Sequence, residues 1–150
     1  MDLFEVIDKM PIFKYFTDQE KQTVCEMDHT LVNFQKGDLI IEEGDTTKSL
    51  FVLMKGSALI TKKADDATIR LSKLKPGELF GEMSFFSDAP RRTNVVANDQ
   101  VIVMKIDETF VEKLDPVLQN KIKDYFIELL IVRLDHMNDS IMAISKSLRF

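Results

Sequence analysis

The sequence predicts an α+β protein in which a zone of short antiparallel strands, forming a sandwich or a jelly-roll barrel, lies between two helical zones. Short runs rich in Val, Ile, Leu, Phe and Thr follow one another over residues 31–106, and all five glycines fall at breaks between them. On either side, apolar residues recur at helical spacing. The 150 residues suffice for one domain with a substantial core, and we expect a single domain over 1–150.

The first zone, residues 1–30, is expected to form two or three short helices. Its apolar residues recur at roughly helical spacing and are interrupted by Pro11. Thr17 followed by Asp18 and Glu20 is typical of a helix start, with a capping residue and an acidic first turn.

The second zone, residues 31–106, carries the expected strands. The apolar runs that turn residues separate are LVNF, LII, SLFVLM, ALITKK, TIRLSKL, TNVVAN and QVIVMKI. Between the fifth and sixth runs lies a different segment, in which Gly81 precedes a short run from Glu82 to Phe86. We consider this run as one helical turn.

The third zone, residues 107–150, returns to helical spacing. A short helix is expected from Glu108 to Leu114, and Pro116 suits the first turn of the next helix. That helix would run for roughly 45 Å. Its expected apolar stripe consists of Leu118, Ile122, Tyr125, Leu129, Val132, Met137, Ile141, Ile144 and Leu148. We expect the stripe to pack on the barrel and on a second copy, as a parallel pair with a partly heptad-like seam.

Composition excludes several classes of function. The balance of 20 basic against 25 acidic residues, a net charge of −5, argues against a general nucleic-acid-binding surface. The N-terminus lacks the pattern of a signal peptide, and no apolar run approaches the ~20 residues of a membrane span. With a single cysteine there is no disulfide framework. A cytoplasmic protein without a membrane partner is therefore expected.

A metal-dependent or nucleophilic enzyme is not expected either. Metal enzymes built on jelly-roll barrels need several ligands converging inside the barrel, and the only histidines, His29 and His136, lie outside the strand zone. Cys25 lies in a helical apolar pattern and is expected to be a small core residue.

The segment after Gly81 has the residues of an anion site. If Glu82 to Phe86 make a helical turn, the first N–H groups are unsatisfied and favour an anion. Arg91 follows a turn and would return to the same place as a bidentate phosphate clamp, beside which Glu82 would accept a ribose hydroxyl. The alternative is an ordinary Glu82–Arg91 ion pair in a loop, and spacing alone leaves both open.

Several motifs together resemble the cyclic-nucleotide-binding domain of catabolite activator proteins, kinase A regulatory subunits and gated channels. The motifs are Phe34-Gln-Lys-Gly37-Asp38, Ile41-Glu-Glu-Gly44-Asp45, Leu50-Phe-Val-Leu-Met-Lys-Gly56 and Pro76-Gly-Glu-Leu-Phe-Gly-Glu82-Met followed by Ala89-Pro90-Arg91. The last of these matches the phosphate-binding cassette of the family, with its spacing of nine from Glu to Arg.

The resemblance implies a jelly-roll barrel (double-stranded β-helix) with N-terminal helices, a short cassette helix and a long C-terminal helix. It implies that Glu82 and the Gly81 backbone hold the ribose 2′-hydroxyl and that Arg91 pairs with the cyclic phosphate. The backbone amides of Ser84 and Arg92 would complete the phosphate cradle. The full set of implied ligand-binding residues is Gly81, Glu82, Met83, Ser84, Arg91, Arg92 and Thr93, with Leu74 and Val95 in an apolar wall around the base.

Two features depart from the family or stay open. Arg92 stands where the family usually carries a small residue or threonine, and threonine there is linked to cyclic GMP, so the choice between cAMP and cGMP is open. As an alternative to a role in the ligand site, the Arg92 side chain would point to solvent or pair with a neighbouring acidic residue. Arg133, Asn138 and Ser140 on the long helix are candidate contacts to the base, or simply solvated surface residues.

The function implied is a non-catalytic sensor of a 3′,5′-cyclic nucleotide, with cAMP ahead of cGMP. Binding would reposition the C-terminal helices, and the partners would be a second copy through the long helix and an unknown effector protein. The alternative is a dimerising interaction module that binds no nucleotide. Direct DNA binding is not expected, because no basic recognition helix follows the long helix.

Overall fold

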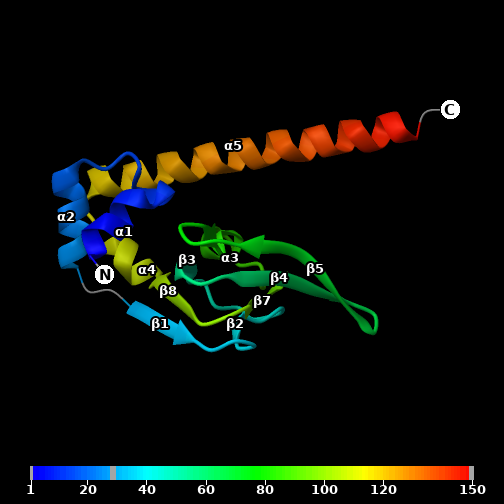
Figure 1. Cartoon of the computed structure of the whole chain (residues 1–150). Helices are drawn as coiled ribbons and strands as arrows, with labels where there is room; N and C mark the ends of the chain where they lie inside the picture. The colour runs from blue at the N-terminus through cyan, green and yellow to red at the C-terminus, as the bar shows by residue number, and fades with distance from the viewer. Residues whose placement is uncertain (1, 28–29, 149–150) are drawn as a thin grey trace.

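The computed structural model describes residues 2–27 and 30–148, and Figure 1 shows most of the helices gathered at one end of two sheets, with one long helix extending past them. The helices are α1 (Leu3–Lys9), the 3-10 helix η1 (Pro11–Phe13), α2 (Asp18–Glu26), α3 (Glu82–Phe86), α4 (Glu108–Glu112) and α5 (Pro116–Ser147). The strands are β1 (Thr30–Phe34), β2 (Leu39–Ile41), β3 (Leu50–Lys55), β4 (Ala58–Ala64), β5 (Ala67–Leu74), β6 (Leu79–Phe80), β7 (Asn94–Ala97) and β8 (Val101–Ile106).

The strands form two antiparallel sheets of four strands each. One has the order β1-β8-β3-β6 and the other β2-β7-β4-β5. The expected antiparallel sheets and long C-terminal helix are therefore present. Among the described strands no ladder joins the two sheets, so their closure into a jelly-roll barrel stays a prediction.

Strand β3 is buried on both faces and separates two apolar cores. Leu50, Val52 and Met54 face the helices, whereas Phe51 and Leu53 face the second sheet. The helix-side core also contains side chains of α1, η1, α2, α4 and the first half of α5. The core between the sheets includes residues of β2, β4, β5, β6, β7 and β8.

Capping side chains set the starts of four helices. Asp2, Asp107 and Asp115 each accept a hydrogen bond from an amide in the first turn of α1, α4 and α5, respectively. Thr17 and Glu20 form a capping box at the start of α2, as the sequence predicts. Pro116 occupies the first turn of α5, where its missing N–H costs no hydrogen bond.

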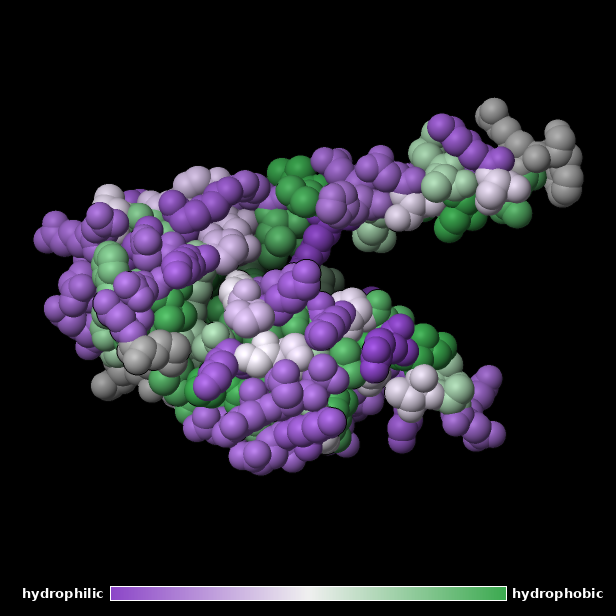
Figure 2. All heavy atoms as spheres, viewed as in Figure 1, coloured by the Kyte–Doolittle hydropathy of each residue, from purple (hydrophilic) through white to green (hydrophobic). Residues whose placement is uncertain are grey.

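The expected single stripe along α5 is wrong, because the helix has two apolar lines on different faces. Leu118, Ile122, Tyr125 and Phe126 are buried against the body. The later residues of the expected stripe, Val132, Met137, Ile141, Ile144 and Leu148, are all exposed on the part of α5 that projects from the body. Figure 2 shows apolar atoms on this projecting part.

The exposed line has its own regular spacing. It consists of Ile127, Leu130, Leu134, Met137, Ile141, Ile144 and Leu148, which we call the α5 seam. The steps alternate between three and four residues, which is the heptad spacing of a coiled coil.

Other expectations are modified in detail. The two-residue strand β6 was not expected, and α4 ends at Glu112 rather than at Leu114. Cys25 is partly buried against the helix-side core, and burial raises the pKa of its thiol. His29 lies outside the described residues, and His136 is exposed on α5. Within the described part, no helix has the length and apolar character that crossing a bilayer requires.

Candidate ligand-binding cavity

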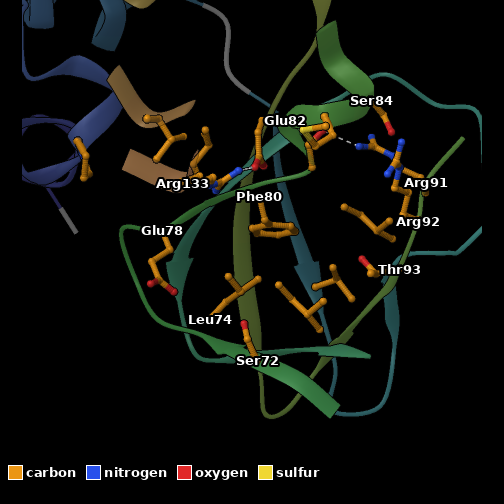
Figure 3. A pocket seen from close by; sticks show the side chains of 18 of the residues that line it. Ser72, Leu74, Glu78, Phe80, Glu82, Ser84, Arg91, Arg92, Thr93 and Arg133 are labelled. Atoms are coloured by element: carbon orange, nitrogen blue, oxygen red, sulfur yellow. Dashed lines mark hydrogen bonds and ion pairs between the residues drawn. The ribbon is translucent and has the colours of Figure 1, made fainter. Parts of the chain in front are cut away.

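A cavity of about 720 Å³ lies between the sheets, the loop around α3 and the middle of α5 (Figure 3). All nine ligand-binding residues expected from the sequence line it: Leu74, Gly81, Glu82, Met83, Ser84, Arg91, Arg92, Thr93 and Val95. The structure thus brings together residues from β5, α3, the following loop and β7.

Gly81 places α3 against the cavity wall. Its φ is +81° and its ψ is 10°, a left-handed conformation that glycine adopts without strain. A Cβ here would lie 2.9 Å from Arg91 Nη1, 3.1 Å from Ile41 Cδ1 and 3.3 Å from the carbonyl oxygen of Ser49. Only a residue without a side chain therefore allows the close approach of Arg91 to this backbone.

Arg91 is a buried cation in the cavity wall, with 5% of its surface exposed. Its Nη1 donates to the carbonyl oxygen of Gly81 at 2.7 Å, and its Nη2 donates to that of Ser49. The backbone is fixed as well, since the Arg91 N–H donates to the carbonyl oxygen of Asp45 at 2.8 Å. Burial lowers the pKa of Arg91, while the Asp45 carboxylate acts in the opposite direction.

One nitrogen of Arg91 has no partner. Within the described residues, Nε is buried and makes no hydrogen bond. The carbonyl oxygens that hold Nη1 and Nη2 are neutral, and among the described residues no carboxylate lies within ion-pair distance of the guanidinium. A buried charge of this kind favours an anion in the cavity.

Glu82 is also buried, at 7% exposure, but its partner comes from a distant part of the chain. Its Oε1 forms an ion pair with Nη1 of Arg133, on α5. The simple Glu82–Arg91 ion pair that spacing left open is therefore not formed. Figure 3 shows the Glu82–Arg133 pair on one side of the cavity and Arg91 with Ser84 on the other.

The remaining polar residues differ in exposure. Ser84 is buried, Thr93 is half-buried, and Met83 is exposed at the rim. The Arg92 side chain is exposed and has no ion pair in the described part of the chain, in line with the solvent alternative. Its carbonyl oxygen accepts a hydrogen bond from Lys62 Nζ at 3.3 Å.

Sequence reasoning missed part of the apolar wall. Besides Leu74 and Val95, the lining includes Ile41, Ile60, Phe80, Tyr125 and Leu129. Phe80 stacks on Phe51, with ring centroids 5.4 Å apart, which fixes its ring in the core between the sheets. Which residues of a short strand face the cavity can be determined only once the register between neighbouring strands is known.

Of the three candidate residues on α5, the structure brings only Arg133 to the cavity. Asn138 and Ser140 are exposed and do not line it, and the Ser140 hydroxyl donates to the carbonyl oxygen of His136 within the same helix. Burial lowers the pKa of Arg133. Nowhere in the described chain are three His, Cys, Asp or Glu side chains placed to share a metal ion.

Comparison with known proteins gives a family match for this region. A family model described as "Cyclic nucleotide-binding domain" matches residues 31–115. The regulatory subunit of a cAMP-dependent protein kinase from Neurospora crassa is 29% identical over 108 residues, which are 72% of this chain and 27% of the relative. The chain spans between 22% and 34% of the first three curated relatives that it matches.

Solved structures share the fold. The Thermus thermophilus catabolite activator protein has a TM-score of 0.80 at 22% identity, covering 90% of this chain and 63% of the other. The regulatory domain of Toxoplasma gondii PKA, solved with cAMP, has a TM-score of 0.69 at 21% identity, covering 84% of this chain and 49% of the other. At these identities the likeness establishes the fold.

Proposed function

Because the chain belongs to the cyclic nucleotide-binding domain family, we propose that it is a non-catalytic, cytoplasmic sensor that binds cAMP in the cavity beside Arg91. The observation that carries the proposal is the buried Arg91 guanidinium, which faces the cavity and has no ion pair with a carboxylate in the described part of the chain. A cyclic phosphate supplies one negative charge and several acceptor oxygens. It could therefore neutralise the Arg91 guanidinium and accept a hydrogen bond from its unpaired Nε.

The other walls fit the rest of a nucleotide. The Glu82 carboxylate accepts hydrogen bonds, as a ribose 2′-hydroxyl requires, and Gly81 offers its backbone beside it. We assign Ser84 and the amide of Arg92 to the phosphate, and Met83 and Thr93 to the edge of the ligand, since all four residues line the cavity. An apolar wall that includes Leu74 and Val95 suits a planar base.

Support for cAMP over cGMP comes from relatives. The curated relatives are regulatory subunits of cAMP-dependent kinases, and one structural neighbour was solved with cAMP. The residue after Arg91 is Arg92, not the threonine associated with cGMP in the family. We therefore assign cAMP as the preferred ligand, with cGMP as the competitor to test.

The first prediction concerns Arg91. Arg91→Ala should weaken cAMP binding by at least about 30-fold, because a buried charge contact to the phosphate is lost. Calorimetric titration of cAMP and cGMP into ligand-free protein measures this directly. Arg70→Ala, which removes an exposed arginine of β5 outside the cavity, is the matched control and should bind like wild type.

Binding by neither nucleotide, in folded protein shown beforehand to be free of nucleotide, would contradict the proposal. That result would favour the alternative of an interaction module that keeps the fold without a ligand. Equal binding by wild type and Arg91→Ala would place the ligand elsewhere.

We further propose that two copies associate in parallel through the α5 seam. The seam residues are exposed along about three heptads, which is long enough for a two-stranded coiled coil. The residues that flank the seam take heptad positions g and e. In a parallel pair they place Arg133 of one copy opposite Asn138 of the other, and Ser140 opposite Ser145. Parallel pairing therefore brings no like charges together. A second copy of the same chain is therefore a suitable occupant.

The output of the sensor would be a changed position of the C-terminal helices α4 and α5. A ligand shifts such an equilibrium only through its different affinity for the two arrangements. The reader would be an effector protein, and the kinase regulatory relatives suggest a protein kinase subunit as the class to test first.

A further inference from the structure

We propose that the free edge of β5 is a docking site for an extended segment of a partner protein, in which acidic residues alternate with apolar ones. The segment would add to the sheet β2-β7-β4-β5 as a further strand beside β5. The first five residues of β5, 67–71, do not line the nucleotide cavity. The inference therefore goes beyond the proposed function and does not depend on it.

β5 lies at one end of its sheet and has a long unpaired edge. It is the longest described strand, with eight residues, and among the described strands it pairs only with β4. In an antiparallel pair, the N–H and C=O groups of alternate residues point away from the neighbouring strand. In the described chain, no turn or loop supplies a backbone hydrogen bond to residues 67–73. These outward groups are therefore free to pair with a further strand.

The hairpin of β4 and β5 projects from the body, so a partner can reach this edge. Figure 1 shows the two strands extending past the rest of their sheet, below α5. Every residue of β5 except Leu74 is exposed. The exposed residues include Ile69 and Leu71, at 46% and 53%. Exposed apolar side chains on a long edge strand favour pairing with another chain.

The two faces of β5 differ in chemistry. Arg70 pairs with Thr61, and Lys63 follows Thr61 by two residues, so Arg70 and Lys63 lie on one face of the hairpin. Ile69 directly precedes Arg70 and lies on the opposite face. A strand added beside β5 would place its side chains alternately on the basic face and on the face of Ile69. Acidic residues at one set of positions and apolar residues at the other therefore match this edge.

The hairpin is basic, in contrast to the chain as a whole. Residues 57–75 contain five basic and two acidic residues, whereas the whole chain has 20 basic and 25 acidic residues. The five basic residues are Lys62, Lys63, Arg70, Lys73 and Lys75. Of these, only Lys62 has an ion pair in the described part of the chain, with Glu43 at 3.9 Å. The other four are exposed cations, which favour an acidic partner.

The same charges argue against a second copy of this chain as the occupant. Pairing of two β5 edges would bring basic side chains of both copies together, and like charges at cross-strand positions destabilise a sheet. Charged side chains on edge strands, lysine above all, commonly prevent such self-pairing. They do not prevent pairing with an acidic strand, so the basic residues of β5 select the partner.

The test begins with an array of peptides of about ten residues in which Glu alternates with Val, Ile or Thr, incubated with the labelled full chain. Companion peptides have the same composition, but their acidic residues stand in one block. We expect the block peptides to bind about fivefold or more weakly than the alternating ones, because only alternation places every carboxylate on the basic face.

A charge reversal on β5 tests the assigned surface. Arg70→Glu should weaken binding of the best alternating peptide about fivefold or more in calorimetric titration, because it places like charges at cross-strand positions. Lys105→Glu is the matched control and should bind like wild type, since Lys105 is an exposed basic residue of β8, an internal strand without a free edge. Denaturant unfolding checks that both variants are folded.

Backbone readouts distinguish strand addition from simple charge attraction. The bound peptide should slow hydrogen exchange at amides of residues 67–73. N-methylation of every second peptide residue blocks one edge of the peptide, so one of the two alternating methylation patterns should abolish binding.

Binding by none of the peptides, or equal binding by alternating and block peptides, would overturn the proposal. Unchanged hydrogen exchange, tolerance of both methylation patterns, or equal binding by wild type and Arg70→Glu would overturn it as well. A changed oligomeric state of Arg70→Glu in sedimentation equilibrium would identify a second copy as the occupant, against the proposal.

Discussion

At the scale of single residues, Gly81 links the geometry of α3 to the position of Arg91. Its φ of +81° is a backbone conformation that favours glycine. A Cβ at this position would lie 2.9 Å from Arg91 Nη1, so any side chain would displace the guanidinium. Gly77, with a φ of +92°, has the same kind of backbone but nothing within 4 Å of such a Cβ. Comparing alanine substitutions at Gly81 and Gly77 therefore separates the effect of backbone strain from that of steric collision.

Gly81→Ala should destabilise the protein by about 1–3 kcal/mol and weaken cAMP binding at least about tenfold. Gly77→Ala should show the loss of stability through strain while keeping most of the affinity. Denaturant unfolding and calorimetric titration of both variants measure the two effects. Normal affinity in Gly81→Ala would mean that Arg91 does not need its present position.

The placement of site residues was predictable where the motif is local in sequence. Glu82 and Arg91 lie nine apart, and both were expected at one site; they line the same cavity. The Glu82–Arg133 pair joins segments far apart in the chain, and the groups that hold Arg91 are backbone carbonyl oxygens. Every residue has such a carbonyl, so sequence offers no signal for the one at Ser49.

At the scale of elements, α5 and the N-terminal helices are joined by carboxylates whose pKa values are lowered. Hydrogen bonds from Lys14 and then Tyr15 lower the pKa of Glu128, and those from Lys121 and the Thr17 amide lower the pKa of Glu20. A carboxyl with a lower pKa in the folded state stabilises it above the unfolded pKa of about 4.3. This contribution is lost as the pH falls through the folded pKa.

The double change Glu20→Gln with Glu128→Gln should therefore lower stability at pH 7, and its difference from wild type should vanish at low pH. Urea unfolding at pH 7, 5 and 3 measures the difference. Glu112→Gln, at an exposed carboxylate without an ion pair in the described chain, should show little pH-dependent difference. A difference that does not shrink between pH 7 and pH 3 would argue for a cause other than these charges.

The elements themselves were largely predictable. Seven apolar runs became strands because turn residues separated them, and the capping pattern at Thr17 marked the start of α2. The two-residue strand β6 has no periodicity to detect. On α5 the apolar residues occupy more than one face. A spacing of three or four residues can be followed from one face to the other, so the predicted stripe combined residues of the buried line with residues of the seam.

At the scale of the whole molecule, the α5 seam determines the expected assembly. Leu134→Asp places a charge in the middle of the seam and should convert a dimer to a monomer in sedimentation equilibrium. Met142→Asp is the matched control, since Met142 is 58% exposed and Leu134 57%, but Met142 lies outside the seam. If wild type is monomeric at micromolar concentrations, or if both variants behave alike, the seam is not the interface.

The overall architecture was predictable as a class, but its arrangement in space was not. Short runs and turn glycines indicate an antiparallel sheet protein. They do not determine that the helix-side core lies against the sheet β1-β8-β3-β6, or that the cavity opens towards α5. Those features depend on pairings such as β3 with β8, between residues about 50 positions apart, which single-sequence patterns do not encode.

The burial of β3 on both faces has a consequence for how the chain finds its register while folding. In a sheet with one wet face, a slip by one residue exposes apolar side chains and is rejected on that ground. In β3 a slip exchanges one buried apolar residue for another, so hydrophobicity discriminates weakly. The correct pairing must be selected at the turn after β3, where a Cβ on Gly56 would lie 2.3 Å from the carbonyl oxygen of Gln100. Gly56→Ala should therefore slow refolding as well as lower stability, and stopped-flow refolding by dilution from denaturant measures the rate.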